Sequence, residues 1–293
     1  AGGGEGGPAV ASSSSFDPFR FDRSPILDNP FSKIQPVEEP SRVFERVRCR
    51  QHVNPLAAMH QVLPNLPSWS DEDRVFEDPS LPLYIDLGCG SGRFLLQLAL
   101  KHKGKANFLG IEIRAPLAHR ANHWREEFGV KNAYVLDGNI NVQGAWDRVL
   151  KGYPGPISGI SALMPDPWFK KRHKKRRMFN TDLVESIANS LEVGGGCFIQ
   201  SDIKAVAIDM RRQLAENPSF VDVTNKCNEA VKIEDCTDDD DGESKEDAKD
   251  PVLEELKKSW LWLSENPTGV ATEREKYVME QRGHVWRALF RKT

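Results

Sequence analysis

From Leu83 onwards the chain alternates short apolar runs with amphipathic segments, and this alternation constrains its fold more than any other feature. The expected strands cover residues 83–87, 107–112, 133–136, 157–163, 197–200, 220–223 and 285–290, and the expected longer helices cover residues 93–101, 115–128, 181–191 and 204–215. Strands that alternate with helices at this spacing predict a mostly parallel sheet covered by helices on both faces. The predicted fold class is therefore α/β, with a seven-stranded sheet.

Composition divides the chain into a tail, an arm and a main domain. Residues 1–15 are almost entirely Gly, Ala and Ser, and residues 16–40 are rich in proline, so we expect a disordered or extended tail over residues 1–40. Residues 41–82 form an N-terminal arm, and residues 83–293 form the main domain. Within that domain, residues 234–250 hold ten acids and two lysines. This acidic run predicts a disordered insertion, and its charge hides a net positive balance in the rest of the chain.

The first fifteen residues and the cysteines bear on location. Transit peptides are rich in serine and poor in acids, so the start of the chain favours a processed protein of a plastid or other organelle over a cytoplasmic or nuclear one. An arbitrary boundary of the sequence is the alternative interpretation. The five cysteines form no C-x-x-C pair, which argues against a zinc site and for a reducing compartment. Because the sequence has no C-x-x-C pair, we expect no metal. No apolar run approaches transmembrane length, so we expect no membrane partner.

A glycine turn, Gly-Cys-Gly-Ser-Gly at residues 88–92, follows the first strand. Such a turn between strand and helix brings backbone N–H groups against a ligand, although it can also be only a tight turn. Glu112 ends the next strand, twenty residues beyond Gly92, where a carboxylate accepts hydrogen bonds from the ribose of an adenosine. Sites for NAD and for S-adenosylmethionine share this pattern. Asp86 would repel a pyrophosphate but not a sulfonium with an amino-acid tail, so charge favours S-adenosylmethionine.

A second informative stretch, residues 163–177, starts apolar, turns at two prolines around Asp166, and then becomes cationic. Because proline ends a strand, we expect Asp166 and Trp168 on a loop at the carboxyl end of a strand, where open α/β sheets bind ligands. Seven of the eight residues 170–177 are Lys or Arg. Cations hold phosphates, an aromatic ring stacks on a base, and a carboxylate meets a base edge, so the stretch favours a nucleic acid. A solvated face or a localisation signal would also explain the charges, and loop packing would explain Trp168.

These residues resemble a known family. Residues 86–92 are similar to motif I of class I S-adenosylmethionine-dependent methyltransferases, and residues 165–173, Pro-Asp-Pro-Trp-Phe-Lys-Lys-Arg-His, resemble the signature of tRNA (guanine-N7)-methyltransferases. Residues 50–56, 110–114 and 272–286 resemble further motifs of that family. The resemblance implies a Rossmann-like class I methyltransferase fold. It also implies transfer of a methyl group from S-adenosylmethionine to N7 of a guanine in tRNA, the variable-loop guanine.

The resemblance implies roles for single positions. The cofactor residues would be Gly88, Glu112, Arg114, Asn139, Ile140, Leu163 and Asp166, to which the glycine turn adds Asp86 and Gly90. The substrate or tRNA residues would be Lys170, Arg172, His173, Lys174, Lys175, Arg176, Arg177, Asp202, Thr272 and Glu275. Asp166 would be the catalytic, guanine-facing acid. Asp202 has the alternative of capping a helix. His52 is either an ordinary surface histidine or part of an arm that touches RNA or closes over the cofactor.

Guanine N7 carries an in-plane lone pair and no proton, so its attack needs no general base, and Asp166 would act by orientation and electrostatics. Two other functions stay open. One is an amino-methyltransferase acting on adenine or on a protein side chain, whose loop carries a second proline that is missing here. The other is an inactive RNA-binding module, against which the three acids Asp86, Glu112 and Asp166 count. A WD-repeat partner subunit, or action alone as a monomer or homodimer, also stays open.

Overall fold

The computed structural model describes residues 16–31, 49–50, 52–66, 68–69, 71–168, 171–232 and 259–293, without the side chain of Lys171. The predicted acidic insertion, the first fifteen residues of the predicted tail and Lys170 lie outside the described residues. None of the described helices is long and apolar enough to cross a membrane.

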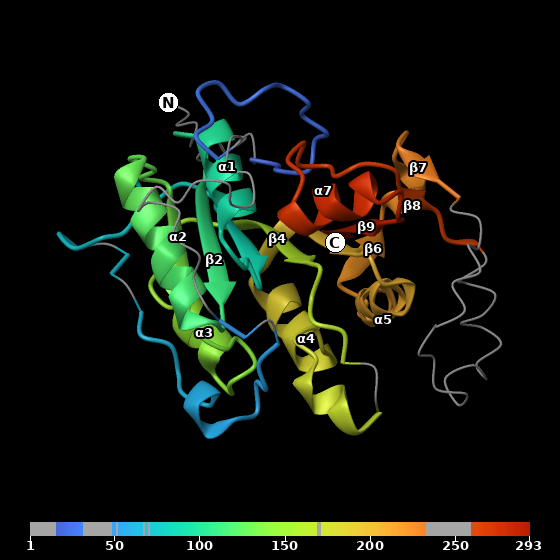
Figure 1. Ribbon diagram of the computed structural model, residues 1–293, viewed down its shortest axis with the longest axis horizontal. Helices are drawn as coiled ribbons and strands as arrows, with labels where there is room; N and C mark the ends of the chain where they lie inside the picture. The colour runs from blue at the N-terminus through green and yellow to red at the C-terminus, as the bar shows by residue number, and fades with distance from the viewer. Residues whose placement is uncertain are drawn as a thin grey trace, which may run out of the picture.

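One seven-stranded sheet organises the protein, in the order β3-β2-β1-β4-β5-β9-β6. Figure 1 shows the sheet running from β2 through β4 to β9. Its strands are β1 Leu83–Leu87, β2 Asn107–Glu112, β3 Ala133–Asp137, β4 Ile157–Leu163, β5 Leu191–Ser201, β6 Phe220–Asp222 and β9 Trp286–Lys292. β1 to β5 pair in parallel, and β9 pairs antiparallel with both β5 and β6. The predicted Rossmann-like, mostly parallel sheet of a class I methyltransferase is confirmed. Chain order reverses between β1 and β4, which is where such sheets bind ligands.

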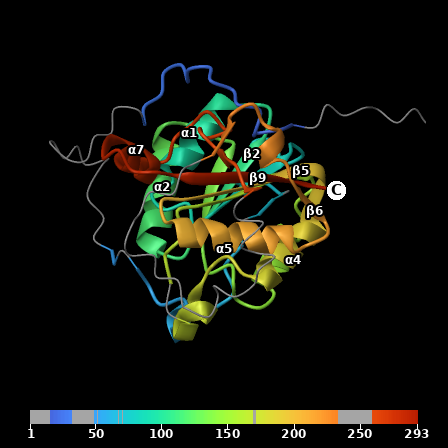
Figure 2. The ribbon, with the colours of Figure 1, turned by 90° about the vertical axis from the view of Figure 1, so that its right-hand side faces the viewer.

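Helices cover both faces of the sheet, as predicted (Figure 2). The helices are α1 Arg93–Lys101, α2 Ala115–Glu127, α3 Ala145–Leu150, α4 Thr181–Ser190, α5 Lys204–Ala215 and α7 Glu273–Glu280. Short 3₁₀ helices are η2 Ala58–His60, η3 Lys171–Arg176 and η4 Thr224–Lys226, and β7 Ala230–Val231 pairs with β8 Trp262–Leu263 in a second, two-stranded sheet. One predicted boundary is wrong by more than two residues. β5 begins at Leu191, not at Cys197, because the glycines that we expected to end a helix lie within the strand.

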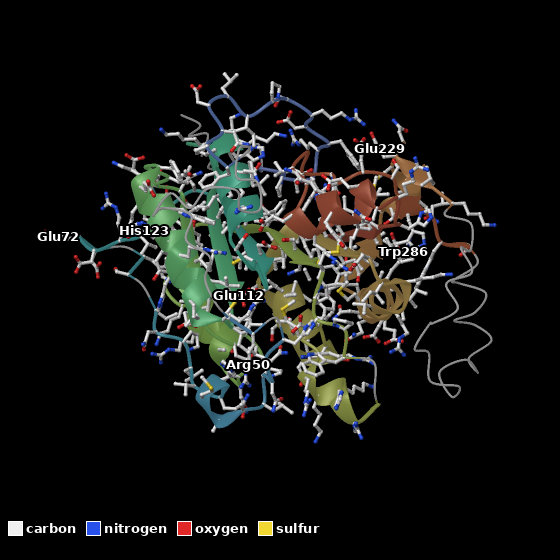
Figure 3. All side chains as sticks on the ribbon, viewed as in Figure 1. Arg50, Glu72, Glu112, His123, Glu229 and Trp286 are labelled. Atoms are coloured by element: carbon white, nitrogen blue, oxygen red, sulfur yellow. The ribbon has the colours of Figure 1, made fainter. Side chains whose placement is uncertain are left out.

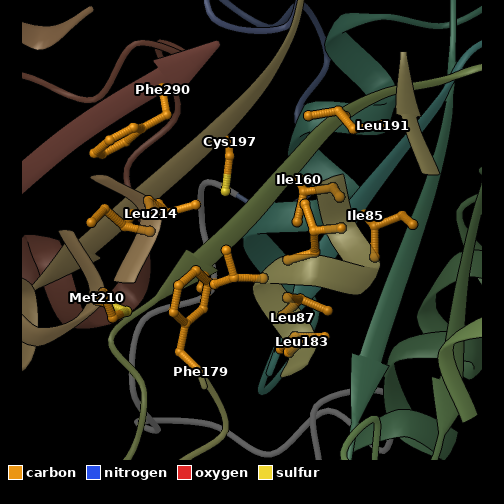
Figure 4. Close-up of a cluster of buried hydrophobic side chains, with 14 of the residues drawn as sticks. Ile85, Leu87, Ile160, Phe179, Leu183, Leu191, Cys197, Met210, Leu214 and Phe290 are labelled. Carbon is orange, nitrogen blue, oxygen red and sulfur yellow. The ribbon is translucent and has the colours of Figure 1, made fainter. Parts of the chain in front are cut away.

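The period of two along each strand divides the core into two clusters. On β1, Ile85 and Leu87 point toward α3, α4 and α5, where they join the cluster that Figure 4 shows around Leu183. Tyr84 points the opposite way, toward α1 and α2, into the cluster that holds Trp124. The strands are therefore buried on both faces, and their carboxyl ends are fixed by packing from two sides.

Residues 16–31 differ from the predicted tail. They contain no helix or strand, yet Phe19 and Phe31 are only 2% and 3% exposed. Arg291 of β9 donates two hydrogen bonds to the Asp17 carboxylate, at 2.9 and 2.7 Å. Phe19 packs over Gly196, where any added Cβ would collide with its ring. Two aromatic anchors therefore hold these residues on the core, and the rest of the division into tail, arm and domain stays a prediction.

Candidate active site

A cavity opens at the carboxyl edge of the sheet, beside the point where strand order reverses. It encloses about 730 Å³ of empty space, its open mouth included. Its walls come from the turn after β1, the ends of β2 and β3, the loop after β4, the end of η3 and the N-terminal arm. The lining residues are Val53, Pro55, Gly88, Ile111, Glu112, Ile113, Arg114, Gly138, Asn139, Ile140, Asn141, Met164, Pro165, Asp166, Trp168, Arg176 and Met178.

The glycine turn contributes Gly88 to the cavity wall. Its backbone adopts a conformation that favours glycine. Gly88, Gly90 and Gly92 have φ of 73°, 58° and 77°, in the left-handed region that side chains rarely adopt. A Cβ added to Gly92 would lie 2.6 Å from the Cβ of Ala121, so the glycine also lets α2 approach. The Gly90 N–H donates to the Glu112 carboxylate at 2.8 Å. The turn therefore wraps around the acid that ends β2.

Glu112 is a buried and fully engaged carboxylate, only 1% exposed, where β2 ends (Figure 3). Its Oε1 accepts hydrogen bonds from the backbone N–H and Nε of Arg114, at 2.9 and 2.8 Å. Its Oε2 accepts from Gly90 and from Nη2 of Arg114, the latter at 3.1 Å. Burial alone would lower the pKa of Arg114, but hydrogen bonds and charge from Glu112, with a smaller contribution from Asp166, raise it. The fold thus fixes both the acid and its counter-ion.

Asp86 lies beneath the cavity and does not line it. It is 3% exposed, and the Ser161 hydroxyl donates to its Oδ1 at 2.6 Å. Burial raises the pKa of Asp86 to about 7, the charge of Glu112 adds to this, and the Ser161 hydrogen bond opposes it. The backbone of Gly90 and the buried Leu163 also lie outside the lining. For these three residues, as for the predicted residues that line the cavity, the cofactor role stays a prediction.

Asn139 anchors the N-terminal arm on the cavity. Its Nδ2 donates to the backbone oxygens of Pro55 and His60, at 3.0 and 3.1 Å, and its Oδ1 accepts the Asn141 N–H at 3.1 Å. Val53 joins Pro55 in the lining. The sequence left open whether the arm touches RNA or closes over the cofactor. The structure places the arm against the cavity that Glu112 lines, and both roles stay predictions.

Asp166 lies on the loop after β4 and faces the mouth of the same cavity. Met164 turns the chain there with a left-handed φ of 53°, and its N–H donates to the Gln200 carbonyl at 2.8 Å. The side chain of Asp166 is 39% exposed. Its Oδ1 lies 2.8 Å from Nδ1 of His52, a residue of the arm. Asp166 and Glu112 therefore line one cavity, and the sequence did not predict the contact of Asp166 with His52.

The basic stretch divides into structural and exposed cations. Arg176 lies over the Trp168 ring at 5.0 Å, and the edge of His173 meets that ring at 5.4 Å. Arg177 donates to the Trp168 carbonyl and to Asp209 of α5, both at 3.1 Å. Arg172, Lys174 and Lys175 are exposed. Trp168 thus packs within its loop while it lines the cavity, and Arg177 ties the loop to α5.

Asp202 does not cap a helix, so that alternative is wrong. The N-cap of α5 is Ile203, which makes no side-chain cap. Asp202 instead accepts two hydrogen bonds from Arg274 of α7, at 2.9 and 2.6 Å. It does not line the cavity. Its predicted substrate contact stays a prediction, and the ion pair links the end of β5 to α7.

Thr272 and Glu275 hold α7 rather than the cavity wall. They form a capping box at its first turn. Glu275 is 4% exposed and accepts hydrogen bonds from Arg287 at 2.8 Å and from Gln200 at 3.1 Å. The residue that brings α7 to the glycine turn is Glu273, which contacts Ser91 and pairs with Arg93 at 2.5 Å. No sequence signal separated Glu273 from its neighbours, and the predicted substrate roles of Thr272 and Glu275 stay untested.

The other residues missed by the sequence are apolar or act through the backbone. Met164 and Met178 line the cavity, and the Sδ of Met178 lies 3.4 Å from the position of a Cβ added to Gly88. Thioether side chains carry no local pattern that marks them as functional. Within the described ranges no cluster of His, Cys, Asp and Glu is placed to hold a metal ion.

The fold and the cavity at its switch point are those of a methyltransferase, and comparison with known proteins agrees. Residues 80–249 match the family described as "Putative methyltransferase". The chain is 39% identical to the tRNA (guanine-N(7)-)-methyltransferase of Synechocystis sp. over 85% of this chain and 99% of that one. It is 39% identical to the enzyme of that name from Trichormus variabilis, over 83% and 95%, and 46% identical to one from Synechococcus sp., over 59% and 70%. The chain belongs to the tRNA (guanine-N(7)-)-methyltransferase family.

Proposed function

We propose that this protein transfers a methyl group from S-adenosylmethionine to N7 of a guanine in tRNA, forming 7-methylguanosine. The observation that carries the proposal is that Glu112 and Asp166 line one cavity at the switch point of the sheet. Glu112 suits the ribose of the cofactor, and Asp166 suits the guanine. The substrate class comes from the relatives, which are tRNA (guanine-N(7)-)-methyltransferases.

The glycine-turn side of the cavity fits S-adenosylmethionine, which would supply an electrophilic methyl group when bound. The Gly90 and Arg114 N–H groups fix the Glu112 carboxylate, and two neighbouring ribose hydroxyls would donate to it in place of the Arg114 side chain. Gly88 leaves the lining open because it has no side chain. Ile111 and Ile140 add apolar walls suited to an adenine ring. These residues would bind and orient the cofactor.

Asp166 would hold and stabilise the reacting guanine. Its carboxylate can accept from N1–H and N2–H₂ of the base, which fixes the ring for in-line attack by N7. Positive charge develops on the ring during the transfer, and a fixed carboxylate stabilises it. Because N7 has no proton to lose, this assignment requires no general base.

The exposed cations of η3 would hold the tRNA backbone. Arg172, Lys174 and Lys175 are exposed beside the cavity wall that Arg176 helps to form. Phosphate contacts give affinity and position a substrate without reading its sequence. The base would then enter the cavity at Asp166, which is the exposed acid of the site.

The target guanine we propose, by resemblance, is the one in the variable loop. A tRNA transcript with that guanine replaced by adenine should accept no methyl group, while the unchanged transcript accepts one. Transfer to both transcripts would place the target elsewhere.

The experiment that tests the function is incubation of the purified chain with tRNA and labelled S-adenosylmethionine, followed by nucleoside analysis. Label in 7-methylguanosine supports the proposal. Label in N6-methyladenosine would favour an amino-methyltransferase. Binding of tRNA without any transfer would favour an inactive RNA-binding module.

A further inference from the structure

His52 and Asp166 form a direct contact between the N-terminal arm and the loop after β4. Nδ1 of His52 lies 2.8 Å from Oδ1 of Asp166, although 114 residues separate them in the chain. Both side chains are partly exposed, His52 at 50% and Asp166 at 39%. An exposed contact of this kind contributes only about 0–1 kcal/mol to stability. The contact therefore matters less for stability than for the position in which it holds the Asp166 carboxylate.

The arm presents His52 from a fixed position. Asn139, in the cavity wall, donates to the backbone oxygens of Pro55 and His60, which lie three and eight residues beyond His52. Arg148 of α3 donates to the Pro64 carbonyl at 3.1 Å. The backbone that carries the imidazole is thus held at several points on the body of the protein.

Asp166 has few other constraints. It follows a residue with left-handed φ, Met164, and it lies between Pro165 and Pro167, outside any helix or strand. Among the described residues, none other than His52 donates a hydrogen bond to its carboxylate, and Oδ2 accepts no bond from them. Because His52 contacts only Oδ1, Oδ2 can accept a hydrogen bond from the edge of a base.

We propose that His52 is a positioning residue for Asp166: it donates Nδ1–H to Oδ1 and holds the carboxylate in the orientation that binds and stabilises the guanine. This inference rests on the proposed function. His52 acts through Asp166 and takes no proton from the substrate, because N7 has none to give. A residue outside the sheet, which does not itself line the cavity, thus positions an acid that does.

The test compares His52→Ala with His52→Asn in methylation of tRNA. The amide nitrogen of asparagine lies the same number of bonds from the backbone as Nδ1, so His52→Asn keeps a donor where His52→Ala removes it. We expect His52→Ala to lower kcat by on the order of 10- to 100-fold, since small misplacements of a catalytic group cost up to about 10²-fold. The KM for tRNA and the affinity for S-adenosylmethionine should change by less than about 2-fold, and His52→Asn should recover most of the rate.

Two controls sharpen the test. His123→Ala removes a histidine that is 65% exposed on α2, and it should leave kcat unchanged. Adding His52→Ala to Asp166→Ala should lower the rate no further, because residues that act through one contact are not additive.

Each other outcome overturns the inference. A wild-type or raised kcat in His52→Ala would show that the contact is idle or obstructs the base. A rise in KM alone would show that the arm binds RNA, and a loss of cofactor affinity would show that it closes over the cofactor. Equal rates for His52→Asn and His52→Ala would exclude donation as the role. A wild-type protein that forms no 7-methylguanosine would instead overturn the proposed function.

Discussion

The two acids of the cavity, Glu112 and Asp166, are held in opposite ways. Glu112 ends β2, is 1% exposed, and is hydrogen-bonded by the glycine turn after β1 and by Arg114, two residues further along. Asp166 lies on a loop, is 39% exposed, and is bonded by a histidine 114 residues away. The sheet and its first turn therefore build the cofactor half of the site, whereas segments remote in the chain assemble the substrate half.

The same division extends to their neighbours. Beside Glu112, the buried Asp86 is held by Ser161 of the adjacent strand β4. Beside the loop half, Asp202 follows the end of β5 and is held by Arg274 of α7, which lies outside the sheet. A rigid half can bind a constant cofactor, and a half made from loops can close around a large RNA. The predictions below test this division by changing one half and measuring the other.

The largest expected effect concerns the buried half and pH. The pKa of Asp86 is raised from 3.8 to about 7, mainly by burial, so the folded protein holds a proton that the unfolded chain releases between these values. The free energy of unfolding should fall as pH rises from about 4 to 7, and Asp86 should cause no further fall above pH 7. Asp86→Asn removes this loss, so at pH 8 the variant should be more stable by up to about 4 kcal/mol.

Urea unfolding of both proteins at pH 5 and pH 8 measures this effect. The gap between variant and wild type should be wider at pH 8. Glu126→Gln, which changes an exposed acid of α2 far from the cavity lining, is the matched control. A constant gap for Asp86→Asn would show that Asp86 is ionised throughout and that the buried half is more polar than its exposure indicates.

Asp166→Ala addresses the loop half. Removing a preorganised electrostatic group costs about 10²–10³-fold in rate, so single-turnover methylation should fall by that factor. The affinity for tRNA should stay nearly normal, because alanine removes no cation. Single-turnover rates beside equilibrium tRNA binding check both statements. An unchanged rate would remove Asp166 from the chemistry.

Glu112→Ala addresses the cofactor half. A hydrogen bond to a charged group is worth about 1.5–3 kcal/mol, so affinity for S-adenosylmethionine should fall about 10- to 100-fold. Calorimetry measures this, with Glu112→Gln as a second variant that keeps the shape beside Arg114. Glu126→Ala, which alters an exposed acid of α2, should bind as the wild type does. Unchanged affinity in both Glu112 variants would refute the assignment of the pocket.

The smallest effect is expected from the exposed cations. Neutralising Lys174, Lys175 and Arg176 together should weaken tRNA binding and flatten its salt dependence by about 0.7–0.9 in log–log slope per lost phosphate contact. Turnover at saturating tRNA should fall much less. Because Arg176 also lies over Trp168, the pair Lys174 and Lys175 is changed separately as a control. A salt slope equal to that of the parent would show that η3 is only a solvated surface.

Features that depend on neighbouring residues could be predicted from the sequence. The strands, the glycine turn and Glu112 follow from local periodicity and spacing, and the loop position of Asp166 follows from two prolines. Contacts between distant segments could not be predicted. Nothing near His52 indicates a partner at Asp166, and nothing near Asp202 indicates Arg274. Phe19 and the buried Glu275–Arg287 pair were missed for the same reason, since only tertiary packing brings them to their partners.

The central claim is that the methyl group goes to N7 of a guanine, and not to the N1–H and N2–H₂ edge that faces Asp166. A tRNA whose target guanine is replaced by 7-deazaguanosine tests it directly, because this base keeps N1–H and N2–H₂ but has carbon in place of N7. Labelled methyl transfer and tRNA affinity are measured for both substrates with the wild-type protein. We predict equal affinity for the two tRNAs and transfer only to the one with N7. Transfer to the 7-deazaguanosine tRNA would contradict the account.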